Sequence, residues 1–187
     1  MKKILASLFL FVTMQANASL ISLSVSDNDI DVGETVTVSV IADMTEAFTG
    51  FQLQLEFDKT IFGFVDGTFS SDLTALSDLA FLSGDESYGF SIDFANFSEV
   101  LAGEYTVLEI ELLGRKNAIG STIGFGTVAA SFLDFFTSEV REVNIATDAG
   151  TVPASVNVNN AVDVPAPASL GLMAMAIAGL VSVRRKA

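Results

Sequence analysis

The sequence predicts an all-β protein whose central part, residues 19–163, folds as an antiparallel β-sandwich. Three observations support this prediction. Apolar and polar residues alternate with a period of two in nine or ten short segments, polar or glycine-containing turns separate these segments at regular spacing, and only one segment has helical spacing. No repeat of 20–50 residues is present, which argues against a solenoid or a propeller.

The predicted strands follow one another along the whole central part. Residues 36–40 show the pattern most clearly, because three valines alternate there with threonine and serine, as in a half-buried strand. The segments with this kind of pattern are 20–25, 36–40, 51–57, 62–65, 90–94, 105–112, 123–128, 132–136, 140–145 and 156–158. Residues 72–82 fit either a short helix or a loop, since Leu73, Leu76 and Leu79 recur at helical spacing.

The first 18 residues have the three parts of a secretory signal peptide. Lys2 and Lys3 are followed by an apolar run over residues 4–14, and Ala16 and Ala18 flank Asn17 in a small-x-small cleavage site. We expect cleavage after Ala18. The alternative is a first membrane helix, but the apolar run is too short to span a bilayer.

The last 24 residues form a membrane-directed segment. Residues 164–183 carry no charge, and 20 helical residues at about 1.5 Å each span roughly one hydrocarbon core. The basic residues Arg184, Arg185 and Lys186 follow directly, and the positive-inside rule places such residues in the cytoplasm, which puts the central part outside. A buried helix that closes a core is the alternative, but it rarely ends in a basic triplet.

The same segment resembles the PEP-CTERM sorting signal of Gram-negative bacteria. The stretch Val164-Pro165-Ala166-Pro167-Ala168 is similar to the Val-Pro-x-Pro-Ala variant of this signal, with Ala166 in place of the usual glutamate. The resemblance implies transient anchoring in the inner membrane, recognition by an exosortase, which is a membrane cysteine transpeptidase, and removal of the helix. A permanent anchor is the alternative.

The composition excludes several function classes. All 23 acidic residues but only four of the nine basic ones lie in residues 19–163, which gives this part a formal charge of −19. Such a surface repels nucleic acid and favours cations such as Ca²⁺. The chain has no cysteine, hence no disulfide, and no histidine, hence no histidine-based triad or zinc site.

The first half of the central part resembles a cohesin-type domain. Residues 32–40 match the family's Gly-x-x-Val-x-Val strand, and residues 48–58 match its Gly-Phe-x-x-x-Leu-x-Phe-Asp strand. The resemblance implies a jelly-roll sandwich over residues 19–152, with 153–163 as a spacer to the sorting signal. Cohesins of cellulosomes bind a dockerin through one sheet face.

Candidate sites in the central part are few. Asp27, Asp29 and Asp31 alternate as in the first half of a Ca²⁺-binding EF-hand loop, although the loop's glycine and bidentate glutamate are missing; a solvated acidic turn is the alternative. We expect Asp58 to cap a turn and Gly50 to mark a bend or a bulge. Neither carboxylate pair, Asp85–Glu86 or Asp93–Glu99, predicts a catalytic cleft, because alternation places Asp93 on the solvent face.

These observations predict a non-enzymatic, exported surface or matrix protein that binds an extracellular protein or polysaccharide. A carbohydrate-binding module that acts on exopolysaccharide is the main alternative, and a line of exposed aromatic side chains on one sheet would favour it. A secreted hydrolase is a third class and would need two facing carboxylates in a cleft. No catalytic residue and no cofactor other than Ca²⁺ is predicted.

Overall fold

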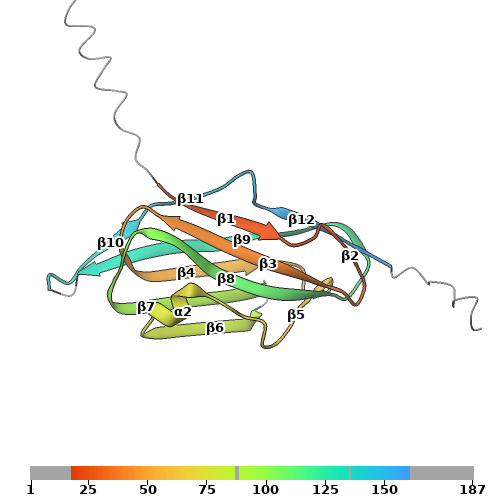
Figure 1. Cartoon of the computed structure of the whole chain (residues 1–187), viewed down its shortest axis with the longest axis horizontal. Helices are drawn as coiled ribbons and strands as arrows, with labels where there is room; N and C mark the ends of the chain where they lie inside the picture. The colour runs from red at the N-terminus through yellow and green to blue at the C-terminus, as the bar shows by residue number, and fades with distance from the viewer. Residues whose placement is uncertain (1–17, 87–88, 135, 161–187) are drawn as a thin grey trace, which may run out of the picture.

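The structure is a computed structural model that describes residues 18–86, 89–134 and 136–160. These residues form twelve strands and one short helix, and the strands build two sheets that pack face to face (Figure 1). The chain enters at β1 and the last strand, β12, ends toward the opposite end of the long axis. The predicted fold class, an all-β sandwich, is confirmed; the predicted terminal helices lie outside the described residues.

The first sheet has five strands. Their order is β11 (Ile145–Thr147), β1 (Ser19–Val25), β3 (Thr35–Met44), β8 (Gly103–Gly114) and β5 (Phe62–Phe64). The alternation that predicted β3 is the alternation of burial, since Val36, Val38 and Val40 are fully buried while Thr37 and Ser39 lie on the outer face.

The second sheet places the long strand β9 (Ala118–Asp134) between three partners. The order is β2 (Asp29–Asp31), β12 (Ala154–Asn159), β9, β4 (Phe48–Glu56), β7 (Gly89–Val100) and β6 (Leu79–Glu86), and β10 (Glu139–Val143) pairs with the last part of β9. Two short edge pairs, β1–β11 and β2–β12, are parallel, and all other pairs are antiparallel.

One apolar core fills the space between the sheets. Leu53, Ile92 and Ile110 are fully buried, and the rings of Phe57 and Phe62 meet edge to face with their centroids 6.5 Å apart. Complete burial of such a side chain contributes about 1.5–3 kcal/mol. Because the chain has no cysteine, this core holds the sandwich together without covalent help.

The segment predicted as a helix or a loop is divided between two elements. The helix α2 covers only Asp72–Leu76 and begins at Ser71, whose hydroxyl accepts the backbone N–H of Leu73 at 3.1 Å. From Leu79 onward the chain forms β6, an edge strand that pairs with β7. The leucines have helical spacing, but the pairing of this segment with β7 makes it a strand at the edge of the sheet.

Two further boundaries differ from the prediction. The segments 123–128 and 132–136 were predicted as separate strands, but β9 runs from the first into the second without a break, because β4 pairs with it over residues 124–131 and β10 continues the pairing as far as Asp134. The sandwich also extends past residue 152, where we predicted the spacer to begin, since Val156 and Val158 of β12 are fully buried.

Candidate functional site

A shallow groove crosses the outer face of the second sheet. Its floor comes from β4, β7 and β9: Gly50 lies opposite both Ala95 and Ser131, and the neighbouring Gln52 lies opposite Ala129. The residues that alternate with these on β4 point into the core, so the floor faces outward. Small side chains therefore leave a hollow of about 940 Å³ above the middle of the sheet.

Exposed apolar side chains stand on both sides of this floor. On one side Val140 of β10 is 69% exposed. Glu142 lies on the same face of β10 and pairs with Ser131 of the floor. On the other side Phe81 of the edge strand β6 is 64% exposed and lies opposite Asp93 of β7. We call these elements together, floor and flanks, the outer groove.

Gly50 allows β4 and the Ser131 side chain to lie close together in the floor. A Cβ atom at this position would lie 2.9 Å from the Ser131 hydroxyl, closer than real Cβ contacts allow. The strand register shifts between Phe48 and Gly50, so the predicted bulge at Gly50 is confirmed. The shift turns Thr49 inward, where its hydroxyl accepts the backbone N–H of Leu133 at 2.8 Å and approaches the Ser131 carbonyl at 3.4 Å.

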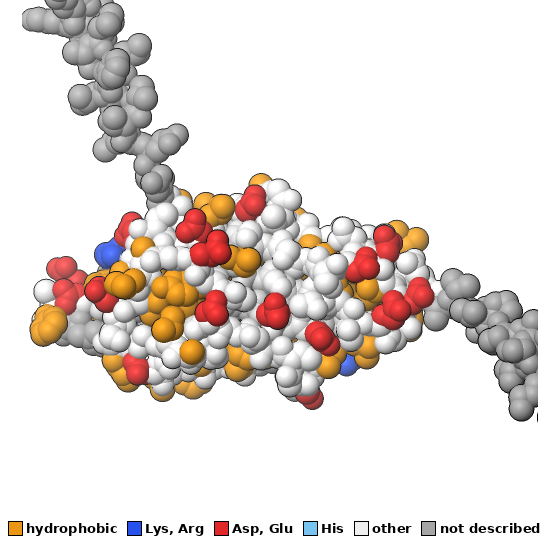
Figure 2. Space-filling view, in the orientation of Figure 1, with side chains coloured by type: hydrophobic (Ala, Val, Ile, Leu, Met, Phe, Trp, Pro, Cys, Tyr) orange, Lys and Arg blue, Asp and Glu red, His pale blue; other side chains and the backbone are white. Residues whose placement is uncertain are grey.

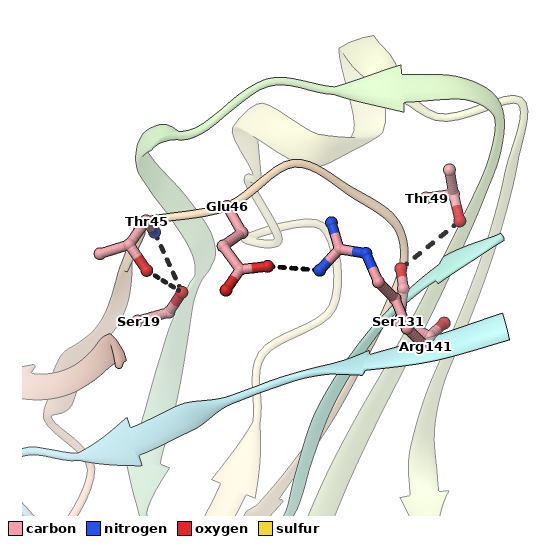
Figure 3. Close-up of polar contacts among 6 residues, drawn as sticks. All are labelled: Ser19, Thr45, Glu46, Thr49, Ser131 and Arg141. Atoms are coloured by element: carbon pink, nitrogen blue, oxygen red, sulfur yellow. Dashed lines mark hydrogen bonds and ion pairs between the residues drawn. The ribbon is translucent and has the colours of Figure 1, made fainter. Parts of the chain in front are cut away.

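Polar contacts tie the β10 flank to the turn between β3 and β4 (Figure 3). Arg141 forms an ion pair with Glu46 in this turn and lies over the Phe132 ring, with its guanidinium carbon 4.8 Å from the ring centroid. The same turn is held by Ser19, whose buried hydroxyl accepts the backbone N–H of Thr45 at 3.0 Å. These contacts fix the position of β10 relative to the floor.

The outer groove is acidic. Asp93 and Glu142 contribute carboxylates to its lining, and no lysine or arginine lines it within the described residues. Acidic side chains are also spread over the face of the molecule shown in Figure 2, where basic ones are far fewer. A ligand of this groove therefore meets apolar flanks, a polar floor and negative charge.

Of the predicted calcium ligands, Asp27 lies in the turn between β1 and β2, and Asp29 and Asp31 lie in β2. The backbone N–H of Asp29 donates to Asp27 Oδ1 at 2.9 Å, and the side-chain amide of Asn157 donates to Asp29 Oδ1 at 2.8 Å. The backbone N–H of Asp31 donates to the Glu34 carboxylate at 2.9 Å. In the part of the chain that the structure describes, no three acidic side chains converge as metal ligands would, so Ca²⁺ binding stays a prediction.

Two aspartates in turns have carboxyl groups with lowered pKa values. The hydroxyl and the backbone N–H of Thr60 donate to Asp58 and lower its pKa, with a smaller contribution from the positive charge of Lys116. The backbone N–H groups of Phe136 and Thr137 lower the pKa of Asp134 in the same way. Asp58 therefore caps a turn, as predicted.

The structure describes only some of the predicted site residues. Asp93 lies on the outer face, as alternation predicted, whereas the side chains of Asp85 and Glu86 are not described. The cleavage residue Ala16, the sorting motif 164–168 and the basic residues 184–186 lie outside the described residues; Ala18 is described and directly precedes β1.

Sequence reasoning missed the outer groove. Gly50, Ala129 and Ser131 are small residues at outward positions of two neighbouring strands, but the register that brings these strands together cannot be derived from either strand alone.

No helix among the described residues is long and apolar enough to cross a membrane.

Comparison with known proteins supports both halves of the sequence interpretation. Residues 163–186 match the family model of the PEP-CTERM protein-sorting motif, which indicates an exported protein. No curated protein matches the sequence.

Solved cohesin domains share the fold of the central part. A type II cohesin from the cellulosome of Acetivibrio cellulolyticus superposes with a TM-score of 0.58 at 17% identity, over 75% of this chain and 95% of that one. A type I cohesin from Pseudobacteroides cellulosolvens gives 0.59 at 12% identity, over 80% and 97%. A type I cohesin–dockerin complex from Clostridium thermocellum gives 0.55 at 10%, over 76% and 94%. The chain thus combines a cohesin-like β-sandwich with a PEP-CTERM sorting motif.

Proposed function

We propose that this chain is a non-catalytic binding module, exported and sorted by an exosortase, that holds an extracellular protein in its outer groove. The observation that carries the proposal is the groove itself, a floor of small residues between the exposed side chains of Phe81 and Val140. Related folds support it, because a similar solved structure is a complex of a cohesin with a dockerin.

The groove has the composition of a protein-binding surface. An aromatic and an aliphatic side chain at its edges can each be covered by a partner, and a few such anchors carry most of the binding energy in typical interfaces. The carboxylates of Asp93 and Glu142 select a partner with lysine or arginine at the matching positions. We therefore expect association to be faster at low ionic strength.

The carbohydrate-binding alternative finds less support in the same surface. The most exposed phenylalanines among the described residues are Phe81, Phe97 and Phe136, which lie on β6, near the end of β7 and in the turn between β9 and β10. Only Phe81 is opposite a floor strand of the groove. Sugar-binding platforms need neighbouring ring faces, so a protein partner fits the groove better.

A pull-down with matched variants tests the proposal. The exported protein, purified after expression of the full chain, is immobilised and exposed to extracellular material of the source bacterium, with and without polysaccharide digestion. We expect a protein to be retained in both cases and to be lost with Ala129→Arg, which fills the groove floor. Ala146→Arg on β11, an exposed alanine of the other sheet, serves as the matched control and should retain it.

Two outcomes would contradict the proposal. Retention that survives Ala129→Arg would place the binding surface elsewhere, and retention that disappears after polysaccharide digestion would favour the carbohydrate-binding module. Sorting is tested separately by mass spectrometry of the mature protein. A C-terminus near Pro167 supports exosortase processing, whereas an intact Ala187 would show that the segment stays as an anchor.

A further inference from the structure

Three of the four basic residues in the described part of the sandwich follow strands that end near one pocket. Lys59, Arg115, Lys116 and Arg141 are the basic residues in the described part of the chain; Lys59 follows β4 of the second sheet, and Arg115 and Lys116 follow β8 of the first. The short strand β5 pairs with the end of β8, and the backbone N–H of Arg115 donates to the Ile61 carbonyl at 2.7 Å. This pairing brings Lys59 and Arg115 together although 55 residues separate them in the sequence.

A pocket of about 550 Å³ lies between these two basic side chains. Its apolar lining comes from Phe64 of β5, from Phe57 and from Leu82 of the edge strand β6. Asp66 contributes one carboxylate to the lining, and among the residues whose side chains the structure describes no ion pair involves Lys59 or Arg115. The pocket lining therefore combines two positive charges, one carboxylate and several apolar side chains.

Gly63 makes room for the arginine. This residue is buried in β5 and does not have a positive φ, so the backbone alone does not demand glycine. A Cβ atom at position 63 would instead overlap the Arg115 guanidinium, which lies directly against the backbone of Gly63. The missing side chain at position 63 therefore leaves room for the planar group at the pocket wall, where it can present a pair of N–H donors to one anion.

We propose that this pocket binds the carboxylate of an acidic peptide segment that also carries an apolar side chain. The fork of Arg115 matches a carboxylate, Lys59 adds a second positive charge, and the ring of Phe64 and the side chain of Leu82 cover the apolar part. Phe57 is 7% exposed and Phe62 is fully buried, so Phe64 is the one partly exposed ring in the described lining. A peptide fits better than a sugar acid because a single ring does not form the row of neighbouring ring faces on which a sugar polymer stacks.

The proposal does not depend on the outer groove. The outer groove lacks basic side chains within the described residues and selects a basic partner, whereas this pocket contains two and selects an acidic segment. The formal charge of the chain, −14, opposes an acidic ligand over long distances. At about 0.15 M salt the Debye length is roughly 8 Å, so distant repulsion is screened while contacts inside the pocket persist.

The test uses two synthetic peptides that differ in one group. Acetyl-Leu-Glu-Leu-amide carries a carboxylate and acetyl-Leu-Gln-Leu-amide carries the neutral amide, and each is titrated into the exported protein purified after expression of the full chain. We expect the acidic peptide to shift the NMR signals of Gly63 and Arg115 and to bind at least about tenfold more tightly than the amide.

Variants at two positions separate charge from geometry. Arg115→Lys keeps the positive charge without the fork, and Gly63→Ala keeps Arg115 but displaces its guanidinium; each should weaken the acidic peptide about tenfold. Gly124→Ala is the glycine control, since a Cβ there meets Pro153 at an ordinary 3.5 Å, and it should leave binding unchanged. Circular dichroism confirms that each variant is folded.

Three results would overturn the proposal. The first is equal affinity for the acidic and the amide peptide, and the second is an acidic peptide that binds Gly63→Ala and Arg115→Lys as tightly as the unchanged protein. The third is the absence of any NMR shift near the pocket. Trigalacturonate serves as the sugar-acid arm. Tighter binding of trigalacturonate than of the acidic peptide, lost in the same variants, would assign the pocket to a uronate polysaccharide and reject the peptide.

Discussion

Replacing Thr49 by valine should loosen the strand that carries the groove floor. Thr49 is 6% exposed, and its hydroxyl is the acceptor of the Leu133 backbone N–H at 2.8 Å. Valine keeps the shape and the β-propensity of threonine but cannot accept a hydrogen bond. A partly buried donor that loses its partner costs about 1–3 kcal/mol, so we expect the free energy of unfolding to fall by about that amount.

Urea denaturation and amide hydrogen exchange measure this effect together. In Thr49→Val the Leu133 amide should exchange faster, by about tenfold for each 1.4 kcal/mol of lost protection, beyond the general rise expected from lower stability. Thr49→Ser is the matched control because it retains the hydroxyl, and Leu133 should stay protected in it. If the Leu133 amide exchanged equally slowly in both variants, the Thr49 hydroxyl would not protect it, and this hydrogen bond would not stabilise β9 in the groove floor.

Three further predictions concern turns and bound ions. Gly89→Ala should cost more than 1 kcal/mol in urea denaturation, since φ there is +143° and a Cβ would collide with the Leu55 carbonyl; unchanged stability would refute this. The pKa of the Asp58 carboxyl is lower in the fold than in the unfolded chain, so this group stabilises the fold above its unfolded pKa of about 3.8 and the stabilisation is lost as the pH falls through the folded pKa. In Asp58→Asn the free energy of unfolding should therefore fall less steeply below about pH 3.8 than in the unchanged protein, and an identical pH dependence would contradict this prediction. If the turn at residues 27–31 binds Ca²⁺, the melting temperature should be higher in Ca²⁺ than in chelator and this difference should vanish in Asp29→Asn; equal melting temperatures would reject the site.

The parts of the fold that could be predicted are those set by local alternation. Val36, Val38 and Val40 in β3 and Leu53 and Leu55 in β4 are fully buried, as their period of two requires. Each residue of such a strand is additional evidence for alternating burial, and this alternation does not depend on which strand lies beside it. The two-sheet architecture follows because a sheet with one apolar face must cover that face with another.

Two edge strands, β6 and β2, escaped prediction, and in β6 the reason is that apolar residues are not confined to one face. Leu79, Phe81 and Leu82 of β6 are all about half exposed or more, so apolar residues occur on both faces and alternation is lost. Only the pairing of β6 with β7 makes this segment a strand. The three-residue strand β2 was hidden because its aspartates are typical of a turn and its parallel partner β12 follows more than 120 residues later.

Both candidate binding sites depend on register rather than on motif. Ser131 reaches the outer groove because it pairs with Gly50, and Arg115 reaches its pocket because β5 pairs with β8. A shift of β9 by one residue would turn Ser131 and Ala129 into the core and bring Ala130 to the floor, so the groove exists only in one register. The buried contact between Thr49 and Leu133 opposes such a shift, because a one-residue slip would remove the acceptor of that N–H. The same hydrogen bond that stabilises the fold therefore also determines which side chains a partner would meet.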